Sequence, residues 1–155
     1  MGKVTVKSLL YKEDGLTLIE SLLVLSVVTL LLTLPTVHFN YLTKKSETAL
    51  FFESFQSSVT LAQNYSVLND AWTVVTFLPS RGEITFRVAG EANHPIEHVL
   101  TLPDHIILLN KTVEFRFSRK SGNIGQFETI SFHTPEGIID YVFQLGSGRF
   151  VVKKK

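Results

Sequence analysis

The chain has 155 residues, with 15 Lys and Arg against 14 Asp and Glu, and it contains no cysteine. The absence of cysteine excludes a disulfide scaffold, a thiolate metal site and a cysteine nucleophile. This length fits one domain plus a targeting segment, and the near-neutral charge excludes long-range electrostatic attraction for nucleic acid.

Residues Met1–Gly15 form a polar leader that contains three lysines and stands directly before an apolar run. A conventional secretory signal would place a small-residue cleavage site after that run. No alanine occurs between Leu16 and Thr48, so we expect the run to be retained in the protein.

The apolar run, Leu16–Val37, consists of Leu, Ile, Val, Ser and Thr with one proline and one ionisable residue, Glu20. About 20 apolar residues in a helix cross the hydrocarbon core of a bilayer, so the sequence predicts a transmembrane helix here. We expect Pro35 to kink it. A carboxylate inside a membrane is a functional-site hypothesis; the alternative is that Glu20 sits among headgroups at the membrane edge.

From residue 38 to the C-terminus the sequence predicts a globular head, which begins with an amphipathic helix reaching about Asn69. The apolar residues of this helix recur at spacings of three and four, which is typical of a face packed on a sheet. That face comprises Ala49, Phe52, Phe55, Val59, Ala62, Tyr65 and Leu68.

Beyond Asp70 short alternating runs with turn residues between them predict β-strands. The predicted strands are Trp72–Leu78, Glu83–Val88, Ile96–Leu102, Ile106–Leu109, Val113–Phe117, Gln126–His133, Ile138–Leu145 and Arg149–Val152. The predicted fold class is therefore α+β, a long N-terminal helix, transmembrane and then amphipathic, packed on a C-terminal antiparallel β-sheet.

No catalytic, cofactor or metal site is predicted. His94 and His98 are four residues apart, but Pro95 lies between them in a strand-like stretch, so they are not expected to share a helix face. The basic groups Arg119-Lys120 and Lys153–Lys155 are small, and we interpret the C-terminal lysines as a solvated tail. Any contact with DNA is expected to be indirect or weak.

The sequence Gly15-Leu16-Thr17-Leu18-Ile19-Glu20 before an apolar helix resembles the class III signal of type IV pilins and pseudopilins. The resemblance implies cleavage by prepilin peptidase between Gly15 and Leu16 and N-methylation of Leu16. It also implies that Glu20 and Thr17 dock the subunit against the amino terminus of its neighbour. Two departures are Leu16 where Phe is usual, and two acidic residues before Gly15 where a basic residue is common.

The same resemblance implies a pilin-like fold and a single-pass protein of the cell membrane. Its leader would be cytoplasmic and its head extracellular, and it would reach the cell surface after assembly. The expected partners are other major and minor pseudopilins, the prepilin peptidase and the membrane.

A closer resemblance is to the ComGD-type minor pseudopilins of Gram-positive competence systems. It rests on the head size, the missing cysteines, Gly122-Asn123-Ile124-Gly125 before a strand and Gly146-Ser147-Gly148 before the last strand. It implies a role in assembling the transformation pilus, which takes up extracellular DNA. Two alternatives stay open: a minor pseudopilin of a type II secretion machine, and a membrane-anchored binding or enzymatic domain with a coincidental prepilin-like start.

Overall fold

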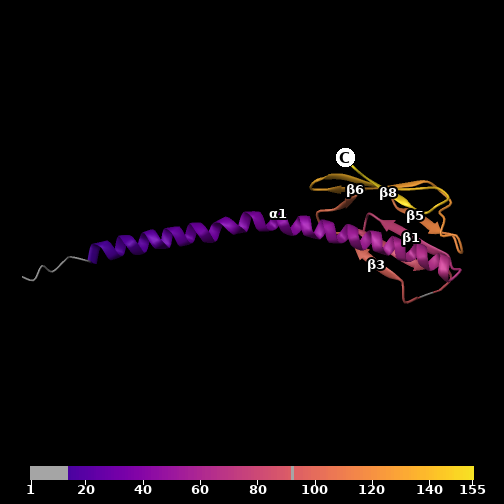
Figure 1. The fold of residues 1–155 in the computed structure, drawn as a ribbon, viewed down its shortest axis with the longest axis horizontal. Coiled ribbons are helices and arrows are strands. Elements are labelled where there is room, and N and C mark those ends of the chain that lie inside the picture. Colours follow the sequence, from indigo (N-terminus) through magenta and orange to yellow (C-terminus); the bar gives the residue numbers. More distant parts are fainter. Residues whose placement is uncertain (1–13, 92) are drawn as a thin grey trace, which may run out of the picture. The chain divides into compact units, whose positions relative to one another are not determined.

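The computed structural model describes residues 14–91 and 93–155; the side chains of residues 14–16 and 33–40 lie outside the description. One helix, α1 (Asp14–Leu68), precedes eight strands (Figure 1). The strands are β1 (Thr73–Leu78), β2 (Glu83–Val88), β3 (His98–Thr101), β4 (Ile107–Leu108), β5 (Val113–Phe117), β6 (Glu128–Thr134), β7 (Gly137–Phe143) and β8 (Phe150–Lys154). Contacts divide the chain into a first unit up to Thr43 and a second unit from Lys44.

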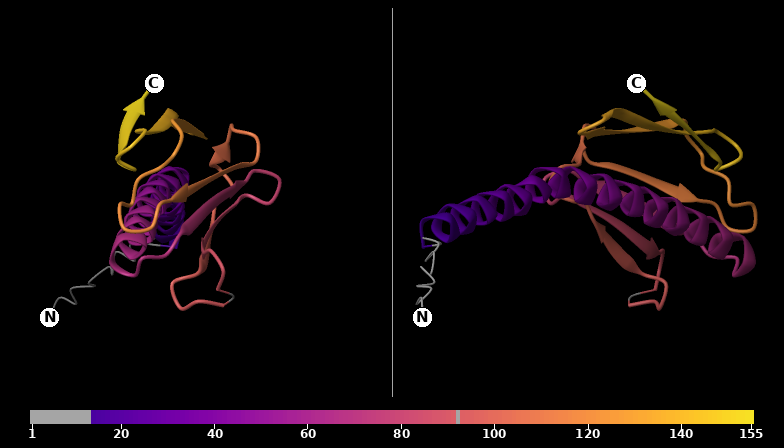
Figure 2. Two further views of the ribbon diagram at one scale, coloured as in Figure 1. Left: turned by 90° about the vertical axis from the view of Figure 1, so that its right-hand side faces the viewer. Right: turned by 60° about the vertical axis from the view of Figure 1, so that its left-hand side comes forward.

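In the second unit the strands form two antiparallel sheets of four strands each. Sheet A has the order β3-β2-β1-β5, and sheet B has the order β4-β6-β7-β8. Two views down and across α1 show its second part running beside both sheets (Figure 2). The strands follow the alternation of the sequence: in β2, Ile84, Phe86 and Val88 are buried, whereas Arg87 is exposed.

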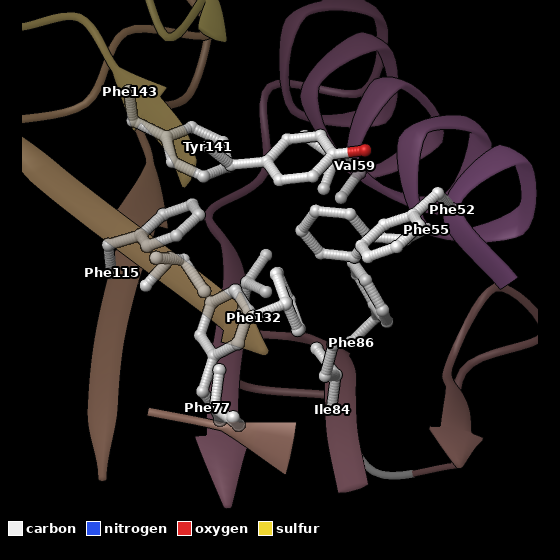
Figure 3. Close-up of a cluster of buried hydrophobic side chains, with 14 of the residues drawn as sticks. Phe52, Phe55, Val59, Phe77, Ile84, Phe86, Phe115, Phe132, Tyr141 and Phe143 are labelled. Atoms are coloured by element: carbon white, nitrogen blue, oxygen red, sulfur yellow. The ribbon is translucent and has the colours of Figure 1, made fainter. Parts of the chain in front are cut away.

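The helix and both sheets share one aromatic core (Figure 3). Phe55 of α1 is fully buried, and its ring meets Tyr141 of β7 edge to face with 4.9 Å between the ring centres. Its ring also lies 5.6 Å from that of Phe132 on β6 and 6.0 Å from that of Phe77 on β1. Edge-to-face pairs at these distances add to the stabilisation that burial alone provides.

A side-chain hydrogen bond ties the core to the helix at its polar margin. Gln56 Nε2 donates to the hydroxyl of Tyr141 over 2.9 Å. Burial raises the pKa of Tyr141 above its ordinary value, and the bond from Gln56 acts against that rise. The phenol therefore stays neutral while its oxygen is satisfied as an acceptor, as a buried polar group requires.

The prediction of a transmembrane helix over Leu16–Val37 is wrong. Among the residues that the structure describes, no helix combines the length and the apolar character that crossing a bilayer requires. Such a crossing needs about 20 predominantly apolar residues. The described apolar part of α1 covers residues 17–32, in which five of the sixteen residues are polar. The predicted single-pass location in the cell membrane depended on that helix, so this prediction is wrong as well.

The expectation of one antiparallel sheet is also wrong, because the eight strands divide into two sheets. The general α+β class still describes the fold. The strands themselves were predicted closely: Glu83–Val88 and Val113–Phe117 have the predicted bounds, and the other six differ by no more than two residues at either end. Helix α1 ends at Leu68, close to the predicted end at about Asn69.

The predicted apolar face of the helix is correct at its centre and wrong at its ends. Phe52, Phe55, Val59 and Ala62 are buried, whereas Leu68 is 81% exposed and Ala49 is exposed as well. Sheet packing covers only the middle turns. Phe51, which the spacing rule missed, is buried beside Phe52 and lies edge to face with Phe132.

The C-terminal lysines are not a free tail. Strand β8 continues through Lys154 and pairs with β7, placing Asp140 opposite Lys153. Lys155 continues the pairing, because its backbone N–H donates to the carbonyl of Ile138. Lys155 Nζ also lies 2.7 Å from the Asp140 carboxylate, which is almost completely buried.

Candidate functional site

The candidate site is the described part of α1 in the first unit, residues 17–32. This helix exposes large aliphatic side chains around its whole circumference, with exposed fractions between 44% for Val28 and 69% for Leu32. A large exposed apolar surface of this kind is typical of a site that contacts another apolar surface. The segment therefore presents a surface suited to packing against apolar helices.

The hydroxyl groups of this segment turn back onto the helix. Ser21 Oγ donates to the carbonyl of Thr17 over 2.7 Å, and Thr29 Oγ1 donates to the carbonyl of Leu25 over the same distance. Ser26 Oγ makes the equivalent bond to Leu23 over 2.8 Å. Back-bonding of this kind satisfies the hydroxyl donors within the helix. Glu20 is then the one ionisable side chain between Thr17 and Leu32.

Glu20 lies in a shallow hollow that runs along one face of the helix. The hollow is lined by Thr17, Glu20, Ser21, Val24, Leu25 and Val28. These residues are three or four positions apart, so they form a single stripe. Small residues at Thr17 and Ser21, four apart, allow a second helix to approach closely in an apolar setting. The predicted docking residues Thr17 and Glu20 thus lie together, and both are exposed.

The predicted cleavage and methylation site lies mostly outside the described residues. The leader Met1–Gly15 is undescribed up to residue 13, and the side chain of Leu16 is undescribed as well. The backbone of Gly15 and Leu16 belongs to the first turn of α1, which begins at Asp14. The predicted kink at Pro35 also lies among the undescribed side chains.

In the second unit, three histidines connect α1 to the segment between residues 94 and 105. His98 Nδ1 donates to the carbonyl of Ile96, so its Nε2 accepts from the hydroxyl of Ser58, which is 2.8 Å away. His94 is placed differently, because its Nδ1 accepts from the N–H of Ile96 and its Nε2 faces the Tyr65 hydroxyl at 2.8 Å. The third histidine, His105, faces the hydroxyl of Thr48 on α1 with its Nε2 at 2.9 Å. Sequence reasoning missed these contacts because their partners are 29 to 57 residues apart.

The Ser58–His98 pair has the spacing of a nucleophile and its base, with a carbonyl orienting the histidine. The closed space beside it, lined by Ala62 and Phe86 among others, has no room for a water molecule. Ser58 and His98 are both half-buried, and their hydrogen bond joins the helix to the sheet. Within the described residues no group of three His, Asp or Glu side chains is placed to hold a metal ion.

No family model matches the chain, and no curated protein and no solved structure is found to match it.

Proposed function

We propose that this chain is a pilin-like subunit, a minor pseudopilin of a competence filament that helps to take up extracellular DNA. The observation that supports the proposal best is the exposed apolar helix of residues 17–32 with Glu20 in its docking stripe. In this proposal the helix packs against the corresponding helices of sibling pseudopilins, and the second unit forms the outward head.

The role of Glu20 follows from electrostatics. Cleavage before Leu16 creates an α-ammonium group near the start of the helix. Two opposite charges about 4 Å apart attract by about 4 kcal/mol at an effective dielectric of 20, against about 1 kcal/mol in water. An unpaired carboxylate inside an apolar bundle of helices is costly in free energy. The subunit therefore favours the axial position in the filament at which Glu20 pairs with the ammonium group of a neighbouring subunit.

The test is Glu20→Val in the full chain, produced together with its sibling pseudopilins. We expect the variant to accumulate and to be cleaved, but not to co-purify with its siblings, and we expect transformation to fall. The matched control is Glu53→Val, because Glu53 is an exposed glutamate on the same helix. Normal assembly and normal transformation of Glu20→Val would refute the docking role.

A gene deletion separates competence from secretion. Loss of transformation with normal protein secretion supports the competence filament. Loss of secretion with normal transformation would move the subunit to a type II secretion machine, the alternative that shares the same helix chemistry.

A further inference from the structure

The outward face of sheet B is largely apolar, whereas the outward face of sheet A is largely polar. In sheet A, strands β2 and β5 alternate between apolar side chains toward the core and polar or charged side chains outward. In sheet B, β7 is apolar on both faces, because Tyr141 and Phe143 point into the core while Ile138 and Val142 point away from it. An apolar run of this kind is typical of a strand that is covered on both sides.

The strand register extends this apolar outward face across sheet B. Val142 pairs with Val151 of β8, which is exposed. At the other edge, Ile107 of β4 pairs with β6 on the outward side and is exposed as well. Leu109 follows two residues later, its N–H donates to the carbonyl of Ser131 over 2.9 Å, and its side chain is exposed. Directly opposite residues of antiparallel strands share one face, so these aliphatic side chains form one exposed apolar surface.

The exposed charges on the outward face of sheet B are basic. Arg149 and Lys153 of the β8 segment are exposed, and neither forms an ion pair within 4 Å among the described residues. Asp140, the carboxylate at the centre of this face, is almost completely buried and lies 2.7 Å from Lys155 Nζ. This face therefore presents apolar side chains together with cations that have no partner within the described part of the chain.

The outward face of sheet A has the opposite charge. With the hollow beside it, this face carries four glutamates against two arginines, so it is acidic by two charges. These residues are Glu83, Glu91, Glu97, Glu114, Arg87 and Arg116. Val99 of β3 pairs with Thr85 on the same outward side, and its exposed side chain adds apolar surface. Complementary charges across an interface steer partners together and fix their register.

The two outward faces do not meet within one molecule. Figure 2 shows strands of sheet B above α1 and strand β3 of sheet A below it, so the faces point in different directions. Two copies that met through sheet B alone would place Arg149 and Lys153 against the same cations, and like charges oppose association. The arrangement that pairs opposite charges is sheet B of one copy on sheet A of another.

We propose that the outward face of sheet B binds the outward face of sheet A of a second copy of this chain. The contact is heterologous, so each copy in a pair keeps one free face and further copies can add to it. The inference uses only residues of the second unit and does not depend on the function proposed above. Association of the heads can fail while docking through Glu20 stands, and the reverse holds as well.

The experiment is sedimentation velocity of the full chain in non-ionic detergent, which covers the apolar helix of residues 17–32. We expect association to rise with protein concentration and to weaken as salt is added, because about 0.1 M salt screens charges beyond about 10 Å. Arg149→Glu on sheet B and Glu83→Lys on sheet A should each weaken association by about tenfold or more. Lys153 is left unchanged, because a carboxylate there would lie opposite Asp140.

Mixing the two variants tests the heterologous arrangement directly. The intact sheet B of Glu83→Lys can bind the intact sheet A of Arg149→Glu, so an equimolar mixture should form pairs but no longer chains. A contact between two identical faces predicts no such recovery.

The matched control is Glu53→Lys, which reverses an exposed charge on α1 outside both sheet faces and should associate as the unaltered chain does. Circular dichroism checks that each variant is folded. Leu109→Ser removes apolar surface without changing charge, so it should also weaken association, and it tests the face even if a charge-reversed variant does not fold.

Three results would overturn the inference: a chain that stays monomeric at low salt, an equal loss in Glu53→Lys, or a mixture that forms no pairs. A monomeric chain that sediments with phosphatidylglycerol vesicles, and loses this binding in Arg149→Glu, would assign the face to an anionic lipid surface instead.

Discussion

Ser58 on α1 and His98 on β3 form a hydrogen bond of 2.8 Å across 40 residues of sequence. The His98 ring stacks on Phe86 with 4.7 Å between the ring centres, so the imidazole is fixed from two directions. A similar bond joins Thr48 to His105 over 2.9 Å near the start of the second unit. Side-chain hydrogen bonds, as well as the aromatic core, therefore hold α1 to the strands.

Replacing Ser58 by alanine should lower the free energy of unfolding by about 1–2 kcal/mol. The substitution leaves the part-buried Nε2 of His98 without its partner, and an unsatisfied polar group costs this much. Urea denaturation followed by tryptophan fluorescence measures the loss. Ser57→Ala, a change at the exposed neighbouring serine, should alter stability by less than about 0.5 kcal/mol. Equal effects of the two substitutions would show that the bond contributes nothing.

Phe55→Ala should cost about 3–5 kcal/mol, because the ring is fully buried among Phe77, Phe132 and Tyr141 and its removal leaves a cavity. The control is Leu50→Ala, at a site that is 62% exposed on the same helix. A loss below about 1 kcal/mol for Phe55→Ala would mean that the helix does not pack on the sheets as described.

Gly148→Ala should destabilise the head more than Gly146→Ala does. Both glycines have positive φ angles, 64° and 76°, so alanine is strained at either position. At Gly148 a Cβ would also collide with the carbonyl of Gly122 and lie 2.6 Å from Gln63 Nε2, whereas the space around Gly146 is open. Since Gln63 Nε2 donates to the carbonyls of Gly122 and Ser147, the collision also disturbs these two bonds. Melting temperatures that fall equally would refute the steric argument.

Asp140 should make stability depend on pH in the acid range. The pKa of Asp140 lies below its ordinary value, chiefly because Lys155 and then Ser131 donate hydrogen bonds to the carboxylate, which outweighs its burial. A lowered folded-state pKa stabilises the fold above the unfolded-state pKa of about 3.9, and that stability is lost as the pH falls through the folded-state value. Asp140→Asn should therefore flatten the fall in stability below about pH 5.

Urea midpoints measured from neutral to acid pH test this dependence. Ser131→Ala, which removes the second hydrogen bond, should give a slope between those of the unaltered chain and Asp140→Asn. An unchanged slope in Asp140→Asn would assign the acid sensitivity to other carboxylates.

Local patterns of the sequence were sufficient for the strands but not for their arrangement. Alternation of apolar residues fixed β2 and β5 to the residue. It could not show that β1 also pairs with β5, because pairing between residues 36 to 44 positions apart leaves no periodic signal. The bond from the Thr73 hydroxyl to the carbonyl of Ala62, which shows that Thr73 faces the helix, follows from no spacing rule.

The candidate docking site was predictable in part, because some of its features are local in the sequence. Glu20 stands out because it interrupts an apolar run, which is a local feature. Thr17 and Ser21 join it because helix geometry alone brings positions three and four apart onto one face. The prediction that this run spans a membrane was wrong, because no helix among the described residues is long and apolar enough for a crossing.

The last prediction concerns processing. If the pilin-like start is read by a prepilin peptidase, the bond between Gly15 and Leu16 is cut and the chain begins at Leu16 with a methylated amine. Gly15 has no side chain, which favours close approach of a peptidase to the backbone. Gly15 lies within the first described turn of α1, so this turn must open for cleavage. Intact mass and N-terminal sequencing of the protein from cells with and without the peptidase measure the outcome.

Gly15→Val should leave the leader attached, while Gly2→Val, inside the leader, should be cleaved normally. A chain that still begins at Met1 in peptidase-containing cells would show that the bond after Gly15 is not cleaved. The ammonium group that Glu20 is proposed to bind would then not be formed.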